Sequence, residues 1–147
     1  AQKSFRNMPR VKIELPDAFM FETEIKVRIS DINYGGHLGN DSVLSMIHES
    51  RYRFFNSLGY KDELSIDGCG TIQADVAIAY KGEAFHGDNI KIEIAVAEIS
   101  RKSFELVYRL SCGTKEIARA KTGIAMFDYN ENKVVNIPSL FLSKIQA

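Results

Sequence analysis

The sequence contains one long helical pattern, which follows directly on a glycine-rich polar turn. Apolar residues recur every three or four positions from Ser42 to Leu58, and this spacing predicts an amphipathic helix. Asn40, Asp41 and Ser42 are residue types that cap helix N-termini, and Gly59 suits a left-handed helix end. Because a single helix must bury its apolar face against another layer, the rest of the chain has to supply that layer.

Most of the remaining sequence alternates apolar and polar residues with a period of two, which is typical of half-buried strands. The short links SRK and CGT predict antiparallel hairpins. A short extension over 134–137 and a helical turn that starts at Pro138 follow the last strand. We therefore predict an α+β domain in which an antiparallel sheet of about five strands wraps around one central helix. The expected strands are 22–29, 71–80, 89–99, 103–112 and 116–127.

The beginning of the chain has no regular pattern of its own. Residues 1–20 are mixed in character and contain Pro9 and Pro16, so we expect an extended arm that covers a sheet edge or a partner subunit. Residues 21–147 then form a single domain. A sheet of this size on one helix leaves edges and apolar surface exposed, and pairing with a second copy of the chain would cover them.

Charge and cysteine usage argue against several classes of partner. The 147 residues contain 19 Lys plus Arg and 19 Asp plus Glu, so nucleic acid and anionic membranes are poor partners. No apolar run reaches the roughly 18 residues of a membrane span, and the first residues lack a signal-peptide pattern. Cys69 and Cys112 have neither a CxxC spacing nor a histidine at a metal-ligand spacing. We expect a cytoplasmic protein without a metal or redox cofactor.

The turn and the helix together resemble a known family. Asp31–Arg51 follows the order D-x-[DN]-x-x-G-H-[VL]-x-N and continues into a helix that contains HESR. The later strands include the corner AYKGEAFHGD and a final Asn-Ile-Pro. This order resembles the hotdog-fold acyl-CoA thioesterases of the 4-hydroxybenzoyl-CoA thioesterase type, from about Phe21 to Ile145. The resemblance implies a dimer or tetramer built on side-by-side sheets, with active sites at the subunit interface.

The chain departs from this family where many members carry a reacting aspartate. That position is Asn33 here, and an amide cannot take a proton from water. Other branches of the fold place the carboxylate on the helix about two turns from its start, where this chain has Glu49. Asp41, at the mouth of the helix, is the other candidate. Two alternatives stay open, because Glu49 could instead pair with Arg53, and Asp41 could be only an N-cap or a first-turn acid favoured by the helix dipole.

His37 occupies the Gly-His position of the family, which implies a hydrogen bond to the thioester carbonyl or to the attacking water. A structural turn histidine is the alternative. Asn33 would position substrate or water, and backbone N–H groups at the helix start would polarise the carbonyl. Asp31 is expected mainly to brace the turn. The residues expected to contact substrate in this region are Asp31, Tyr34, Gly35, Gly36, Gly39 and Asn40.

Basic side chains near strand ends are expected to contact the phosphates of coenzyme A. Arg101 and Lys102 in the SRKS link are the first candidates, and Lys81 in YKGE is the next. A solvated turn charge is the alternative for each of them. The sequence has no glycine-rich phosphate-binding fingerprint that would replace them.

These features predict an enzyme that hydrolyses an acyl-CoA or acyl-carrier-protein thioester. Coenzyme A would enter only as part of the substrate. The missing loop aspartate suggests one alternative, a hotdog protein that binds acyl thioesters without hydrolysing them. An acyl-CoA hydratase is a third and weaker reading, because the Asp and His motif expected of that branch is not found.

Overall fold

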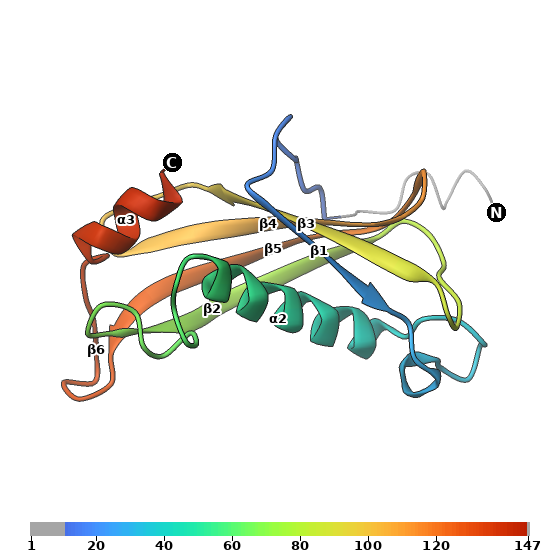
Figure 1. Ribbon diagram of the computed structural model, residues 1–147, viewed down its shortest axis with the longest axis horizontal. Coiled ribbons are helices and arrows are strands. Elements are labelled where there is room, and N and C mark those ends of the chain that lie inside the picture. Colours follow the sequence, from blue (N-terminus) through green and yellow to red (C-terminus); the bar gives the residue numbers. More distant parts are fainter. Residues whose placement is uncertain (1–10, 147) are drawn as a thin grey trace.

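The computed structural model describes residues 11–146, in which an antiparallel sheet curves around one long helix (Figure 1). The strand order is β1-β3-β4-β5-β2, with the short β6 paired to β5. All of the paired strands run antiparallel, as the short hairpin links predicted. The α+β architecture is therefore confirmed. In chain order the elements are β1 (Phe21–Lys26), the 3₁₀ turn η1 (Ile29–Asp31), α2 (Asn40–Ser57), β2 (Gly70–Tyr80), β3 (Asn89–Ala97), β4 (Ser103–Cys112), β5 (Lys115–Asp128), β6 (Lys133–Val134) and α3 (Ser139–Ile145).

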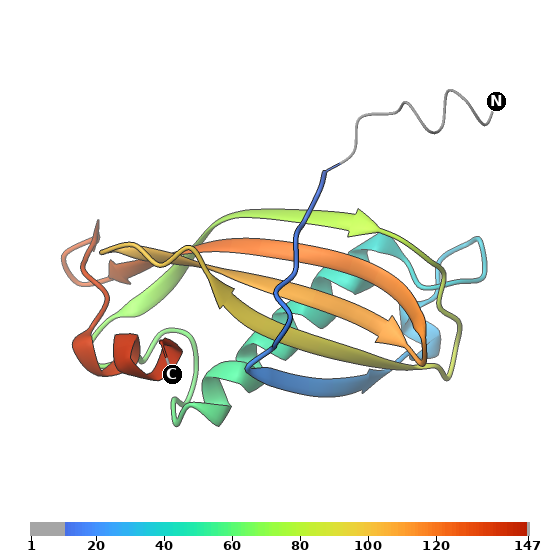
Figure 2. The same cartoon turned by 90° about the horizontal axis from the view of Figure 1, so that it is seen from above.

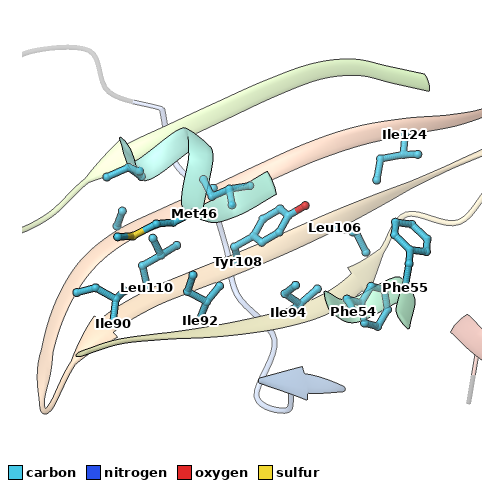
Figure 3. Close-up of a cluster of buried hydrophobic side chains, with 14 of the residues drawn as sticks. Met46, Phe54, Phe55, Ile90, Ile92, Ile94, Leu106, Tyr108, Leu110 and Ile124 are labelled. Carbon is cyan, nitrogen blue, oxygen red and sulfur yellow. The ribbon is translucent and has the colours of Figure 1, made fainter. Parts of the chain in front are cut away.

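The main core lies between α2 and the face of the sheet that curves around it. Figure 3 shows Met46 and Phe54 of α2 close to the isoleucines and leucines of β3 and β4. The alternation predicted for the central strands is confirmed, because every second residue is buried. On β5 this buried face is formed largely by small and branched residues, which leave room for the helix. The buried strand residues include Ile90, Ile92, Ile94, Leu106, Leu110, Ala118, Ala120, Thr122, Ile124 and Met126.

Two polar contacts are enclosed in this apolar layer. The hydroxyl of Tyr108 hydrogen-bonds to Thr122 Oγ1 at 2.8 Å, and Arg51 Nε donates to Glu63 Oε1 at 2.7 Å. Within residues 11–146, no buried side-chain nitrogen or oxygen lacks a hydrogen-bond partner. Because buried polar groups are costly when unpaired, these contacts favour one position of α2 on the sheet.

The second helix, α3, closes the end of the sheet that lies far from the 31–39 turn (Figure 1). Pro138 is its N-cap, so the helix begins at Ser139, one residue later than predicted. Phe141 is fully buried in the main core. Its ring centroid lies 5.8 Å from that of Phe55, 5.7 Å from that of Tyr60 and 5.5 Å from that of Phe104. These aromatic contacts join α3 to α2 and to the start of β4.

The start of α2 differs from the sequence prediction. The helix begins at Asn40, and Gly39 is its N-cap without any side-chain hydrogen bond. Capping by Asn40, Asp41 or Ser42 is therefore wrong as a prediction, whereas Asp41 does lie in the first turn as an acidic residue. The physical reason is that the first bond of the helix closes on Gly39, because the N–H of Val43 donates to the carbonyl of Gly39 at 3.1 Å. Gly59 does adopt a positive φ of 96° just after the helix, as predicted.

The alternation within 22–29 predicts that Ile29 faces the core, and the alternation within 71–80 predicts that Ile72 and Val76 share one face; both predictions are wrong. Strand β1 ends at Lys26 and the 3₁₀ turn η1 follows, so Ile29 is 73% exposed. In β2 the register shifts between Gln73 and Asp75, which marks a β-bulge. One extra residue reverses the faces, so Ile72 and Val76 lie on opposite sides of the strand rather than together.

The arm runs across the outer face of the sheet, on the side opposite α2 (Figure 2). Ile13 is buried there against Ala95 and Val107. Arg119 Nη1 donates to the carbonyl of Ile13 at 3.1 Å, which ties the arm to β5. The part of the arm that the structure describes therefore covers a sheet face rather than an edge. The prediction for residues 1–10 lies outside the described residues.

The aromatic contacts of Phe141 predict a large effect on stability. We expect Phe141→Ala to lower the free energy of unfolding by about 3–5 kcal/mol, because it leaves a cavity between α3, α2 and β4. Leu140→Ala, at a neighbouring side chain that is 56% exposed, is the matched control and should cost about 0.5 kcal/mol or less. Urea denaturation measures both, and equal losses would contradict this account of α3.

Candidate active site

Asp31 anchors the turn that leads into α2. Its carboxylate is buried and accepts hydrogen bonds from the backbone N–H of Arg28 at 2.8 Å and from the Arg28 guanidinium at 3.4 Å. Burial by itself would raise the pKa of this carboxyl, but the Arg28 hydrogen bonds and charge, with the Ser42 hydroxyl, lower the pKa below its ordinary value. The contacts of Asp31 are thus with its own chain, as expected of a residue that braces the turn.

Asn33 and His37 form the tip of the same turn. Asn33 Oδ1 accepts the backbone N–H of Gly35 at 2.9 Å and that of His37 at 3.4 Å. The backbone N–H of Asn33 in turn donates to the carbonyl of His37 at 2.9 Å. Asn33 therefore shapes the turn through its amide oxygen. A Cβ on Gly35 would lie 3.3 Å from His37 Nε2, so the glycine lets the imidazole ring lie close to the backbone.

The N-terminus of α2 lies directly behind this turn. The first N–H groups of a helix have no partner within the helix, and the helix dipole adds partial positive charge there. Asp41 Oδ1 would lie only 2.8 Å from a Cβ on Gly39, so the carboxylate folds back over the helix cap and requires a small residue there. Asn40 and Asp41 are both exposed at this end.

A cavity of about 240 Å³ opens between the turn, the helix start and the corner that follows β2. His37 and Asn40 line one side of it, and Tyr80 and Glu83 line the other. His37 Nε2 lies 3.8 Å from Glu83 Oε1. The apolar part of the lining is formed by Leu38, Val43 and Ile117, with Gly82 beside them. The cavity therefore combines an imidazole, a carboxylate and a helix N-terminus, the groups that acyl transfer requires.

Sequence reasoning missed two of these lining residues, Tyr80 and Glu83. Both belong to the corner AYKGEAFHGD that carried part of the family resemblance, and that was the only signal available. Burial raises the pKa of the Tyr80 phenol, and the negative charge of Asp41 raises it further. Asp41 itself does not line the cavity.

Glu49 lies on a different flank of α2. It lines a separate cavity of about 330 Å³ between the helix and β1, together with Arg28 and Arg53. Arg53 Nε donates to Glu49 Oε2 at 2.8 Å, and Arg53 Nη1 donates to Thr23 Oγ1 at 2.8 Å. The structure thus shows the ion pair that was the alternative for Glu49, and it does not bring this carboxylate to His37.

The candidate phosphate contacts are divided between the two ends of the sheet. Lys81 lines a cavity of about 650 Å³ under the arm, together with Lys12 and Arg119. Tyr80 lines this cavity as well as the one at His37, so the two are adjacent. The backbone carbonyls of Arg101 and Lys102 accept N–H groups from Ile137 and Met126 at the α3 end of the sheet (Figure 1). Within one subunit, this pair is therefore remote from His37.

Tyr34 and Gly36 are exposed residues of the turn. Tyr34 is fully exposed, and Gly36 has a φ of 85° that favours glycine. Among residues 11–146, no group of three or more His, Cys, Asp and Glu side chains could hold a metal ion. No helix in the same part of the chain is both long and apolar enough to span a membrane.

Comparisons with known proteins agree with this geometry. A family model described as "Thioesterase-like superfamily" matches residues 27–145. Among solved structures, a 1,4-dihydroxy-2-naphthoyl-CoA thioesterase from Synechocystis is similar with a TM-score of 0.76 and 21% identity, covering 86% of this chain and 95% of that one. A gentisyl-coenzyme A thioesterase is similar with a TM-score of 0.75 and 19% identity, covering 84% of this chain and 98% of that one.

A hypothetical protein from Aquifex aeolicus has the same fold, with a TM-score of 0.79 and 21% identity over 86% of this chain and 99% of that one. No curated protein sequence matches this chain. At these identities the solved structures establish the fold alone.

The hydrogen bonds that Arg28 donates to the Asp31 carboxylate predict a pH-dependent contribution to stability. Since its pKa is lowered on folding, its stabilising effect is present above the ordinary aspartate pKa and is lost as the pH falls through the folded value. We expect Asp31→Asn to lower the free energy of unfolding by about 1–3 kcal/mol at pH 7, and the difference from wild type to shrink below about pH 4. Denaturant titrations across this range measure it, and a constant difference would contradict the role of the charge.

Proposed function

This chain belongs to the thioesterase-like superfamily and has the hotdog fold, and we propose that it hydrolyses the thioester bond of an acyl-CoA or acyl-carrier-protein substrate. One observation carries the proposal: His37 and the N-terminus of α2 line the same cavity. A thioester carbonyl bound there would face an imidazole and several free backbone N–H groups. These are the groups that stabilise the negative charge of a tetrahedral intermediate.

The proposed reaction begins with water attacking the carbonyl carbon. The carbonyl oxygen gains negative charge, which the N–H groups at the start of α2 and the imidazole of His37 stabilise. The carbon–sulfur bond then breaks, and the proton that the attacking water loses passes to the sulfur, which gives one acid and one thiol. Asn33 contributes by holding the turn in shape, since its amide oxygen is engaged by the backbone. Of the two carboxylates expected to assist, Asp41 is the chain neighbour of Asn40, which lines this cavity, whereas Glu49 pairs with Arg53 elsewhere.

The site is proposed to lie at an interface between two copies of the chain. Strand β2 forms one edge of the sheet, and over its 11 residues it is paired on one side only among the described residues. Val76 and Tyr80 of this strand are exposed, and so are Leu44 and Tyr52 of α2. Figure 2 shows β2 along the free edge. Antiparallel pairing of two β2 strands would cover this edge and border the His37 cavity, because Tyr80 ends the strand there.

The phosphate end of coenzyme A is proposed to lie in the cavity under the arm. Lys12, Lys81 and Arg119 give that cavity three cationic side chains, and Tyr80 connects it to the reaction site. Arg119 also pairs with Glu116 at 2.9 Å, so the two lysines are the freer charges. Phosphate groups favour such clusters of cations.

The similar structures suggest which acyl groups to test first. Two of them are named as thioesterases of aromatic acyl-CoA molecules. Non-hydrolytic binding is the second candidate function, because Asn33 stands where the family resemblance implies a reacting aspartate. Both functions place the thioester in the same cavity, and they differ in whether thiol is released.

The proposal predicts thiol release from a panel of aromatic and aliphatic acyl-CoA thioesters. Free thiol is measured with a chromogenic disulfide, and binding of uncleaved thioester by calorimetry. If cations hold the phosphates, the matching N-acetylcysteamine thioester should show a lower kcat/KM than the CoA thioester, mainly through a higher KM. Binding without thiol release would support the non-hydrolytic alternative, and neither binding nor release by the folded protein would reject both.

If two copies of the chain pair through β2, one charge introduced on β2 should separate them. Val76 is 48% exposed, so Val76→Lys should leave the fold intact while placing a cation in the apolar contact between two β2 edges. We expect a shift from dimer to monomer in light scattering and a fall in thioesterase activity. Val134→Lys, at an exposed valine on β6, is the matched control and should leave the dimer unchanged. A Val76→Lys protein that stays dimeric would show that the interface does not lie along β2.

A further inference from the structure

We propose that Glu83 is the catalytic carboxylate of this site and takes the place of the aspartate that the turn lacks at Asn33. This inference rests on the proposed thioesterase function. Glu83 lines the same cavity as His37, and its Oε1 lies 3.8 Å from His37 Nε2. Asn40, at the first position of α2, lines that cavity as well. A water molecule in this space would lie between the carboxylate and a carbonyl bound at the helix N-terminus.

The position of Glu83 follows from backbone contacts on both sides of the cavity. The N–H of Leu38 donates to the carbonyl of Ala84 at 2.8 Å, which joins the turn to the corner after β2. Ala84 itself is buried. Because Leu38 and Ala84 are the chain neighbours of His37 and Glu83, this hydrogen bond holds the two functional side chains next to each other.

The corner is also fixed against β5. The N–H groups of Lys81 and Gly82 both donate to the carbonyl of Ile117, at 2.8 and 3.1 Å. A Cβ on Gly82 would lie 2.8 Å from the carbonyl oxygen of Glu116, so only glycine fits this close approach. The backbone that carries Glu83 is therefore rigidly placed, whereas its side chain is 60% exposed and can meet a substrate or a water.

The other nearby carboxylates are engaged elsewhere. Asp31 is held by Arg28, and Glu49 is held by Arg53 on another flank of α2. Asp88, in the same corner as Glu83, accepts the backbone N–H of Phe85 at 2.9 Å. Asp41 folds over Gly39 and lies outside the cavity lining. Among the residues that line the cavity, Glu83 is the one with a carboxylate.

In the proposed step, the Glu83 carboxylate accepts a proton from water as the water oxygen bonds to the thioester carbonyl carbon. The carbonyl π electrons move to its oxygen and give a tetrahedral anion beside His37 and the start of α2. When that anion collapses, the carbon–sulfur bond breaks and the sulfur takes the bond electrons. The proton held by Glu83 then passes to the thiolate, so water and thioester yield one acid and one thiol, and the carboxylate is regenerated.

The test compares Glu83→Gln with wild type on whichever thioester the acyl-CoA panel shows to be cleaved. We expect kcat to fall by about 10²- to 10⁴-fold, because the amide cannot accept the proton. The Kd of a non-hydrolysable thioether analogue should remain within about twofold, since the shape of the cavity is kept. Glu83→Asp should retain part of the activity. Glu24→Gln, the same change at an exposed glutamate on the opposite edge strand β1, should keep the wild-type kcat.

Chemical rescue separates a catalytic carboxylate from a structural one. Formate or azide added to Glu83→Gly should restore part of kcat without changing the far-ultraviolet circular dichroism of the folded variant. A wild-type kcat in Glu83→Gln would overturn the role of Glu83 and leave the thioesterase function in place. If Asp41→Asn then lost its kcat while Glu83→Gln kept it, the catalytic carboxylate would be Asp41. A wild-type protein that cleaves no thioester in the panel would overturn both.

Discussion

The packing of one helix against one curved sheet is the constraint from which the site follows. The buried face of α2 must meet the buried residues of β3, β4 and β5, and this fixes the direction in which the helix runs. Its N-terminus then lies at the end of the sheet where β2 turns back toward β3 (Figure 1). Partial positive charge, free backbone N–H groups and the β2 corner are therefore brought together by the same packing that stabilises the core.

The polar residues of the turn serve this arrangement in two ways. The side-chain oxygens of Asp31 and Asn33 accept backbone N–H groups, so these two residues stabilise the conformation of the turn. His37 and the groups across the cavity remain open to a ligand. With an amide at the expected acid position, the proposed reaction needs a carboxylate from another segment, and Glu83 is the one that lines this cavity.

The two faces and two edges of the sheet have different surroundings. The inner face packs on α2, and the described part of the arm lies on the outer face through Ile13. Of the two edges, β1 is also close to α2, where Arg53 donates to Thr23 Oγ1 and to the carbonyl of Glu24. The β2 edge carries exposed apolar residues, and its last residue, Tyr80, lines the His37 cavity. This asymmetry favours β2 over the outer face as the place for a second copy of the chain.

The sequence by itself determined the elements, because local periodicity reports which side of each segment is buried. The alternation on β3 to β5, the hairpin links and the single helix all follow from residue spacing, and the turn with His37 was identified from its residue types. The spacing of Glu49 and Arg53 already suggested their ion pair, but only the tertiary structure decided which flank of α2 faces the His37 cavity. It places Glu49 on the flank beside β1 instead. It also decided the bulge that separates Ile72 from Val76 and the approach of Glu83 to His37. These outcomes depend on contacts between segments far apart in the chain, which no local pattern encodes.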